Sequence, residues 1–289
     1  MNEIPSDIKI FLEELFHARD FSFIKTGGGC INQTYHVSTG KQRFFLKFNS
    51  AQNLRGLLDK EKNGLDFISK QQIIKTPSII SFSENKNRQL MLLEWINNKA
   101  ATPIGWQTFG KQLAALHQVT NENFGFDEDN FIGSLPQQNQ PAKDWIHFFI
   151  ESRLKPQVSL ALKNDYLQLE QLDLFEKLYQ KIPAYFEDEK PSLLHGDLWS
   201  GNFIFNENDQ PVLIDPAVYF GHRSMDLAMT KLFGGFEKSF YEAYDYHFPL
   251  PKNHLHQWTI CNLYPLLVHL NIFGSAYYQQ VNSILKLYS

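Results

Sequence analysis

The sequence has little cysteine, little net charge and no long hydrophobic run. Its two cysteines, Cys30 and Cys261, are too few for the disulfide framework of a secreted domain and indicate a reducing compartment. The formal net charge of -4 gives no reason to expect nucleic acid or an anionic membrane as a partner. No apolar run approaches the length of a membrane span, and residues 1–16 are acidic where a secretory signal would be basic. The sequence therefore predicts a soluble, cytoplasmic protein and leaves the oligomeric state open.

Apolar residues make up 43% of the sequence and aromatic residues 15%, which is enough for one large domain or two lobes. Alternating or aromatic-rich runs between turn residues predict antiparallel strands in the first third of the chain, and helical periodicity dominates the rest. We therefore expect an α+β fold with two lobes, residues 1–95 and residues 96–289. Strands are expected at 21–25, 33–38, 43–48, 79–83 and 89–95, and helices at 6–18, 53–71, 165–186, 236–246, 254–272 and 275–287.

The most distinctive stretch is His-Gly-Asp-Leu-Trp-Ser-Gly-Asn at residues 195–202, followed by Asp215 after a short strand. Asp197 offers an acceptor for a hydroxyl proton, and Asn202 and Asp215 offer hard oxygen ligands for Mg²⁺. These groups suit phosphoryl transfer from ATP, in which the protein positions the reactants and neutralises charge. The spacing of Asp, Asn and second Asp is also that of the catalytic loop in kinase-like folds. The plain alternative is an ordinary hairpin with these residues in its turns.

A lysine stands within an apolar strand near the N-terminus. Because a buried cation is costly unless it meets an anion, Lys47 in the run Phe44-Phe45-Leu46-Lys47-Phe48 should have an acidic partner. The helix expected next carries Glu61, and together they would form the lysine–glutamate pair that positions a kinase's α- and β-phosphates. The alternative for Lys47 is a solvated charge on an edge strand.

Two further segments are candidates for binding the nucleotide. Gly27, Gly28 and Gly29 lie between the first two expected strands, where bare backbone could approach phosphates; the run is not a Walker loop, and a plain hairpin turn is its alternative. The end of the fifth expected strand, Leu93-Glu94-Trp95-Ile96, is the expected hinge between the lobes. Its backbone from Glu94 to Ile96 could read an adenine edge while apolar neighbours enclose the ring.

The segments HGDLWSGN, DPAVYFGHR and MDLAMTKLFGGF together resemble the fructosamine kinase (ketosamine 3-kinase) family, which is related to the aminoglycoside and choline kinases and shares their protein-kinase-like fold. The resemblance extends from the glycine loop to about residue 236. It implies a ketosamine acceptor, of the fructosamine or ribulosamine type, that is phosphorylated on its 3-hydroxyl in a deglycation reaction.

The resemblance also implies roles for residues around the catalytic loop. Asp226, at the start of a helix, should accept hydrogen bonds from the loop backbone; the alternative is a charge that only favours the helix N-terminus. From their positions alone, Trp199, beside the base, would stack on a sugar-like or planar acceptor or pack the loop, and His222 and Arg223 would face the ligand or brace the loop. Ser224 stands where the family usually has an acidic residue, so no ion pair is carried over to it.

Two functional alternatives accompany this interpretation. The protein could be a kinase for another hydroxylated amine, such as an aminoglycoside or a choline-like compound, or a nucleotide-binding regulatory pseudokinase. The presence of every polar residue expected at the site counts against a pseudokinase.

The polar segment 121–141 is expected to be a functional flap or substrate-side surface. His117, on an apolar helix face, is expected to be a hydrogen-bonded core residue rather than a ligand.

Overall fold

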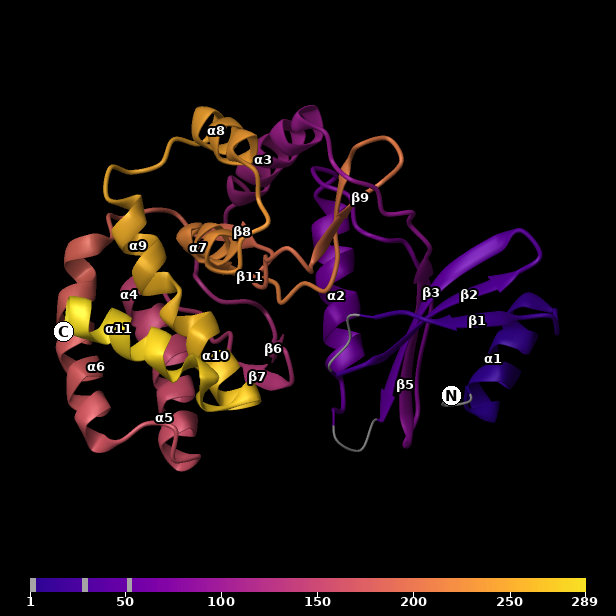
Figure 1. Cartoon of the computed structure of the whole chain (residues 1–289), viewed down its shortest axis with the longest axis horizontal. Helices are drawn as coiled ribbons and strands as arrows, with labels where there is room; N and C mark the ends of the chain where they lie inside the picture. The colour runs from indigo at the N-terminus through magenta and orange to yellow at the C-terminus, as the bar shows by residue number, and fades with distance from the viewer. Residues whose placement is uncertain (1–3, 28–30, 51–53) are drawn as a thin grey trace. The chain divides into compact units, whose positions relative to one another are not determined.

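The computed structural model describes residues 4–27, 31–50 and 54–289 (Figure 1). The chain divides into two compact units, the first comprising residues 1–62 and 77–97 and the second residues 63–76 and 98–289. An antiparallel sheet dominates the first unit and helices dominate the second, so the expected α+β class is confirmed. Among the described residues, no helix combines the length and apolar character needed to cross a bilayer.

The first unit is built on an antiparallel sheet with the strand order β1-β2-β3-β5-β4. Phe44, Leu46 and Phe48, which alternate along the central strand β3, enter one apolar cluster that helix α1 (Ser6–Phe16) covers. Leu46 and Phe48 belong to this cluster, so Lys47 between them points to the opposite face of the sheet. The strands are β1 (Ser22–Lys25), β2 (Gln33–Thr39), β3 (Gln42–Ser50), β4 (Ile79–Glu84) and β5 (Arg88–Glu94).

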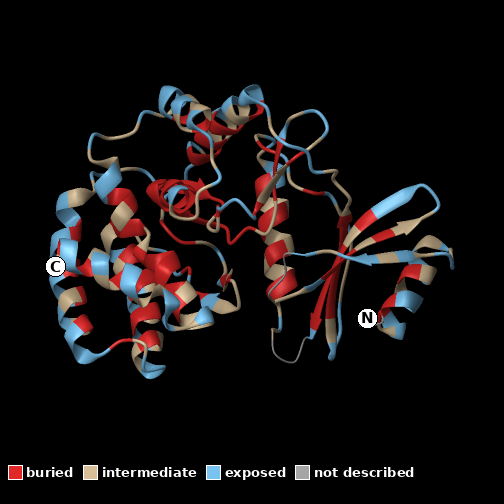
Figure 2. Ribbon diagram, viewed as in Figure 1, coloured by how far each residue is buried: buried red, intermediate tan, exposed pale blue. Residues whose placement is uncertain are grey.

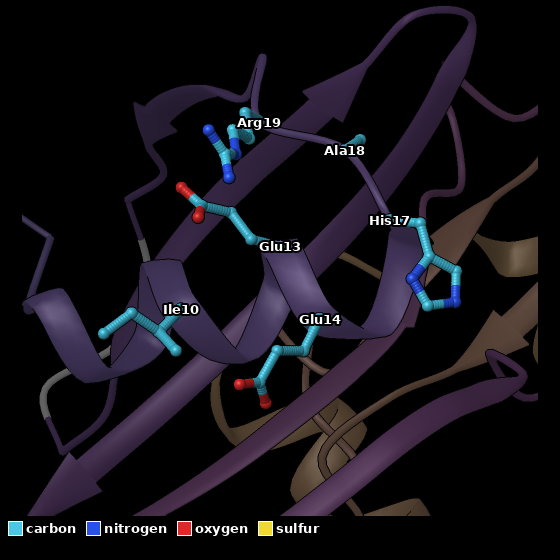
Figure 3. Close-up of a pocket in the computed structure, with 6 residues that line it drawn as sticks. All are labelled: Ile10, Glu13, Glu14, His17, Ala18 and Arg19. Carbon is cyan, nitrogen blue, oxygen red and sulfur yellow. The ribbon is translucent and has the colours of Figure 1, made fainter.

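Helix α1 ends at Phe16, after which His17 adopts a left-handed φ of 51°. A surface hollow lies beside this end of the helix (Figure 3). Its lining mixes acidic, basic and apolar side chains and includes no residue that the sequence assigns to phosphoryl transfer. The lining residues are Ile10, Glu13, Glu14, His17, Ala18 and Arg19.

Helix α2 (Leu57–Lys70) carries Glu61 and begins in the first unit. The first amides of a helix lack partners within the helix, and here a sheet side chain supplies one. Gln89 of β5 is wholly buried, and its Oε1 accepts from the amide of Leu58 at 2.8 Å. Its Nε2 donates to the carbonyl of Leu54 at 2.7 Å. Gln89 therefore fixes the turn of α2 from which Glu61 projects.

The second unit is a helical body around an aromatic-rich core (Figure 2). Helix α3 packs against α8, and α10 packs against α5 and α11. A π-helical turn at Phe149–Leu154 joins α4 to α5. The helices are α3 (Pro103–His117), α4 (Trp145–Phe148), α5 (Lys155–Lys163), α6 (Leu169–Lys181), α7 (Ser224–Leu232), α8 (Lys238–His247), α9 (His254–Cys261), α10 (Leu263–Phe273) and α11 (Tyr278–Tyr288).

The prediction of one helix over 254–272 is wrong in one respect, because α9 and α10 are separate helices that meet at Asn262. Pro265 explains the break: a continuous helix would need its missing N–H and would press its ring against the carbonyl of Cys261. The helix predicted at 165–186 is also shorter. It begins after a capping box formed by Gln168 and ends at Lys181 in a 3₁₀ turn.

The second unit also contains three short pairs of antiparallel strands. They join β6 (Asn130–Ile132) to β7 (Leu135–Gln137), β8 (Ser192–Leu194) to β11 (Tyr219–Gly221), and β9 (Phe203–Phe205) to β10 (Pro211–Leu213). The first pair lies within the segment 121–141. That segment is therefore partly ordered as a hairpin, and several of its polar side chains are buried in the core.

Replacing Gln89 with Met would leave the buried amide of Leu58 without its partner. We expect the free energy of unfolding to fall by about 1–3 kcal/mol, measured by urea denaturation. The control is Gln71→Met at the other end of α2, where the lost bond to the Phe67 carbonyl lies at a partly exposed position. This control should cost less than about 1 kcal/mol. Equal losses in the two variants would contradict the role given to Gln89.

Candidate active site

A hairpin brings together the two residues expected to bind a metal. Asn202 comes just before β9, and Asp215 follows β10 by two residues. The register pairs Phe203 with Leu213, and the amide of Ile214 donates to the carbonyl of Asn202 at 3.0 Å. Asn202 and Asp215 therefore lie at the same open end of one hairpin. An amide oxygen and a carboxylate are hard ligands of the kind that Mg²⁺ takes in proteins, so the donor set fits this ion.

Asp197 is hydrogen-bonded to Asn202. The Nδ2 group of Asn202 donates to both the carbonyl and the Oδ2 atom of Asp197, each at 2.8 Å. This leaves the Oδ1 atom of Asn202 as the one that can face a cation. The pKa of Asp197 is raised to about 7, chiefly by burial; the Asn202 hydrogen bond opposes this rise, and the negative charges of Asp215 and Asp226 contribute to it. A carboxyl group with a pKa near neutrality suits a proton acceptor.

The buried ring of His195 links the catalytic loop to the hairpin. Its Nε2 atom lies 2.9 Å from the carbonyl of Ile214, and its Nδ1 atom lies 3.2 Å from the amide of Asp197. Because a carbonyl only accepts and an amide only donates, Nε2 carries the hydrogen and Nδ1 the lone pair. Burial also lowers the pKa of His195, which keeps the ring neutral. His195 thus holds the residue before Asp215 against the backbone of Asp197.

Asp226, in the first turn of α7, lies against the backbone of the catalytic loop. Its carboxylate accepts from the amides of His195 at 2.8 Å and Gly196 at 2.9 Å. His117 adds a contact of 3.2 Å between Nε2 and Asp226, and its Nδ1 atom lies 2.8 Å from the hydroxyl of Tyr244. His117 is therefore a buried, hydrogen-bonded core residue, as expected from its place on an apolar helix face.

Gly196 allows two chain segments to cross at the start of the catalytic loop. It has a left-handed φ of 83°, and a Cβ atom there would lie 2.0 Å from the carbonyl oxygen of Ala217. The amide of Ala217 donates to the carbonyl of His195 at 2.8 Å. Only glycine meets both requirements, so the loop and the segment after Asp215 are held in direct contact.

In the first unit, the expected partner of Lys47 is present. The Nζ atom lies 2.7 Å from Oε1 of Glu61, and both side chains are buried. Lys47 lies opposite Thr34 of β2 and Met91 of β5, so it belongs to a central strand and the edge-strand alternative is excluded. A buried cation and its anion are held together here because neither is solvated by water.

The base of the glycine loop is closed by two hydrogen bonds between Thr26 and Thr34. Gly27 is described, and a Cβ atom there would meet nothing within 4 Å. Gly28 and Gly29 lie outside the described residues, so the expectation placed on them stays a prediction.

The expected hinge needs one correction. Strand β5 ends at Glu94, whose amide donates to the carbonyl of Ser78 at 2.9 Å. This amide therefore cannot read an adenine base. Trp95 and Ile96 lie beyond the strand, and the ring of Trp95 packs on His36 with centroids 4.2 Å apart. Leu93 is buried within the sheet. The expectation that the backbone of Trp95 and Ile96 reads an adenine edge stays a prediction.

Arg223 and His222 are buried and support the second unit. The guanidinium of Arg223 makes a two-bond contact with Glu189 at 3.0 and 2.9 Å and donates to the carbonyls of Phe248 and Pro249, each at 2.8 Å. Burial lowers the pKa of His222 to about 4. The partners of Arg223 lie outside the catalytic loop, so the two alternatives, facing the ligand or bracing that loop, stay predictions.

Trp199 is 38% exposed and packs on its own loop. Its ring lies over Gly201, where a Cβ atom would come within 2.3 Å of it, and meets Phe233 edge-on with centroids 6.2 Å apart. One part of the indole is thus fixed while another faces solvent. Stacking on an acceptor stays a prediction that this geometry permits.

Comparison with known proteins bears on this arrangement. The sequence model for the fructosamine kinase family matches residues 6–288. The chain belongs to the fructosamine kinase family. A probable ketoamine kinase of Enterococcus faecium is 37% identical over 261 residues, which cover 90% of this chain and 92% of that protein. A chloroplastic protein-ribulosamine 3-kinase of Arabidopsis thaliana is 35% identical over 268 residues, which cover 91% and 81%.

Solved structures give the same family and the wider fold. A putative fructosamine-3-kinase from Thermobifida fusca matches with a TM-score of 0.87 and 30% identity, covering 96% of this chain and 97% of that one. A mutant of the aminoglycoside phosphotransferase APH(4)-Ia, solved with AMP-PNP and hygromycin B, matches with a TM-score of 0.65 over 98% of both chains. At 14% identity that second likeness shows the fold alone. The expected kinase-like fold is confirmed.

This fructosamine kinase family member also contains supporting residues that sequence reasoning missed. His195 and Gln89 were assigned no role, although each is buried in contact with a segment that carries a candidate site residue. A histidine directly after an apolar strand was the available signal for His195. Ser224 departs from the acidic residue expected by resemblance, and its hydroxyl donates to Oε1 of Gln257 at 2.9 Å instead of forming an ion pair.

Substituting Gly196 with Ala should disrupt the catalytic loop, because the new methyl group would meet the Ala217 carbonyl. The matched control is Gly234→Ala, at a φ of 70° but with open space around the added Cβ atom. The control should lose about 1–2 kcal/mol of unfolding free energy from the left-handed conformation alone. Gly196→Ala should lose about 1–3 kcal/mol more, from the clash. Thermal and urea unfolding measure the loss in each variant. Indistinguishable losses would show that the catalytic loop and the segment after Asp215 do not pack as described.

Proposed function

We propose that the protein is an ATP-dependent kinase that phosphorylates the 3-hydroxyl of a ketosamine, of the fructosamine or ribulosamine type. The observation that carries the proposal is the contact between Asp197 and Asn202 at the same hairpin end as Asp215. Membership of the fructosamine kinase family supports the acceptor class, since one relative is named a protein-ribulosamine 3-kinase and another, from mouse, a ketosamine-3-kinase.

Asp197 would act as the proton acceptor. It would orient the acceptor hydroxyl, whose oxygen forms a bond to the γ-phosphorus while the bond to the β–γ bridging oxygen breaks. The hydroxyl proton passes to Asp197, and ADP leaves. Asn202 and Asp215 would hold Mg²⁺, which supplies neutralisation of phosphate charge when bound.

The remaining candidate residues would bind the nucleotide. Lys47, held by Glu61, would contact the α- and β-phosphates, and Gly27–Gly29 would approach them with backbone amides. The segment Leu93–Ile96 would receive the adenine. In this proposal residues 1–95 form the nucleotide-binding lobe and residues 96–289 the catalytic lobe.

The product suggests a biological role. A phosphate on the carbon beside the ketosamine carbonyl is a better leaving group than a hydroxyl, so phosphorylation would promote breakdown of the adduct and release of the amine. We therefore propose a deglycation activity. The low cysteine content favours a reducing compartment such as the cytoplasm as its setting.

The acceptor class can be tested with Mg²⁺, ATP and a panel of fructosamines, ribulosamines, aminoglycosides and choline. We expect ADP formation with ketosamines and only background with the other compounds, and phosphorus NMR should place the new phosphate on O3. Turnover confined to aminoglycosides or choline would favour the other small-molecule kinases. ATP binding without turnover on any acceptor would instead indicate a pseudokinase.

The role of Asp197 can be tested with Asp197→Asn. We expect ATP binding to stay nearly intact while turnover falls by about 10²–10⁴-fold, because the amide cannot accept the hydroxyl proton. The control is Asp173→Asn on the exposed face of α6, which should leave both unchanged. Unchanged turnover in Asp197→Asn would refute its role as the base.

A further inference from the structure

Asp215 has an unusual backbone conformation. Its φ of 54° lies in the left-handed region, which residues other than glycine rarely adopt. It also precedes Pro216, and a residue before proline is normally restricted to extended conformations. Such a conformation persists only when the chain is held on both sides. On the upstream side, Ile214 is held through its amide by Asn202 and through its carbonyl by His195.

On the downstream side, two carbonyls are held by side-chain amides. The carbonyl of Ala217 accepts from Nε2 of Gln137 at 3.1 Å, and the carbonyl of Val218 accepts from Nδ2 of Asn130 at 2.8 Å. Both side chains come from the β6–β7 hairpin. This hairpin lies in the polar segment that the sequence suggested as a flap, and its role here is to hold the chain after Asp215.

These amides form a connected, buried group with Asn139, which we call the amide clamp: Asn130, Gln137 and Asn139. Their exposures are 6%, 1% and 1%. Asn130 Oδ1 accepts from Gln137 at 2.8 Å and from Asn139 at 3.1 Å. The hydroxyl of Tyr264 donates to Oε1 of Gln137 at 2.8 Å, which turns the donating Nε2 group toward Ala217.

A wholly buried arginine supports the clamp from the π-helical turn. The Nη2 atom of Arg153 donates to Oδ1 of Asn139 at 2.7 Å, and Nη1 donates to the carbonyl of Gln138. The guanidinium lies 4.0 Å from the ring centre of Tyr219. A buried cation is costly and is tolerated here because carbonyl oxygens and an aromatic face surround it. π-Helical turns often mark functional sites.

We propose that the amide clamp is a positioning device for Asp215. By holding the carbonyls of Ala217 and Val218, it keeps Asp215 in its left-handed conformation at the same hairpin end as Asn202. The inference rests on the proposed function, because only there is Asp215 a metal ligand. Asn130, Gln137 and Asn139 are positioning residues, and loss of one should weaken metal binding beyond any general loss of stability.

The test compares Gln137→Met with Gln157→Met in the full-length protein. Both remove a buried glutamine amide from the second unit, but the described hydrogen bonds of Gln157 join it to Asn271, which is not part of the amide clamp. Binding of Mn²⁺ in the presence of AMP-PNP is measured by electron paramagnetic resonance, and melting temperatures are recorded alongside. We expect Gln137→Met to raise the half-saturating Mn²⁺ concentration about tenfold or more and Gln157→Met to leave it unchanged.

If the half-saturating Mn²⁺ concentration is the same in the two variants, whether or not it differs from that of the wild-type protein, the proposal is overturned. If Gln137→Met does not fold, Tyr264→Phe takes its place, since it removes only the hydroxyl that orients Gln137. That variant should raise the half-saturating concentration about fivefold, and an unchanged value would overturn the proposal. Measurements on the wild-type protein distinguish failure of the proposed kinase function from failure of the amide clamp. If it binds Mn²⁺ with AMP-PNP but phosphorylates no ketosamine, the proposed function fails while the clamp is still tested by its variants.

Discussion

The site depends on the carboxylate of Asp226, which accepts hydrogen bonds from two consecutive backbone amides. After β8 ends at Leu194, the chain turns sharply at Gly196, and the amides of His195 and Gly196 point to the same place. Asp226 accepts both in charge-assisted hydrogen bonds, which are stronger than neutral ones and hold the turn in the protein interior. With this turn fixed, the His195 ring reaches Ile214, and Asp197 reaches Asn202. A single anion in α7 thus sets the geometry of three segments.

The second unit stabilises this turn with polar groups set in an aromatic core. Arg153 and Arg223 are both buried, and each is surrounded by carbonyl oxygens and aromatic rings. Arg223 also binds Glu189 in the segment before β8 and the carbonyls of Phe248 and Pro249 after α8, and so it joins these two segments. Networks of this kind fix a single arrangement because each misplaced member would leave a buried polar atom without a partner. A rigid support is what the proposed metal ligands and the proposed proton acceptor would require.

The sequence predicted the parts of the site that have local signatures. Asp197 and Asp215 follow short strands and Asn202 precedes one, at a fixed spacing, and Lys47 stands out because its neighbours are apolar. The partners that hold these residues have no such signature. Gln89, Asn130 and Gln137 are ordinary polar residues in the sequence, and only the folded chain brings them to Leu58, Val218 and Ala217.

Other features also depend on tertiary context. The left-handed conformation of Asp215 runs against the preference set by Pro216, so no local rule predicts it. The sequence offers Arg223 as a residue that faces a ligand or braces the catalytic loop, and gives no sign of its contacts with Glu189, Phe248 and Pro249. The break between α9 and α10 was missed because the apolar periodicity continues across Asn262, although Pro265 signals it.

Asn202 and Asp215 are proposed to form one metal site beside Asp197, the proposed proton acceptor. The most direct measurement is anomalous diffraction from crystals grown with Mn²⁺ and AMP-PNP. The account predicts an anomalous peak about 2.0–2.3 Å from both Oδ1 of Asn202 and a carboxylate oxygen of Asp215, with Asp215 still at a positive φ. A bound metal that contacts neither residue, or an Asp215 carboxylate turned away from Asn202, would contradict it.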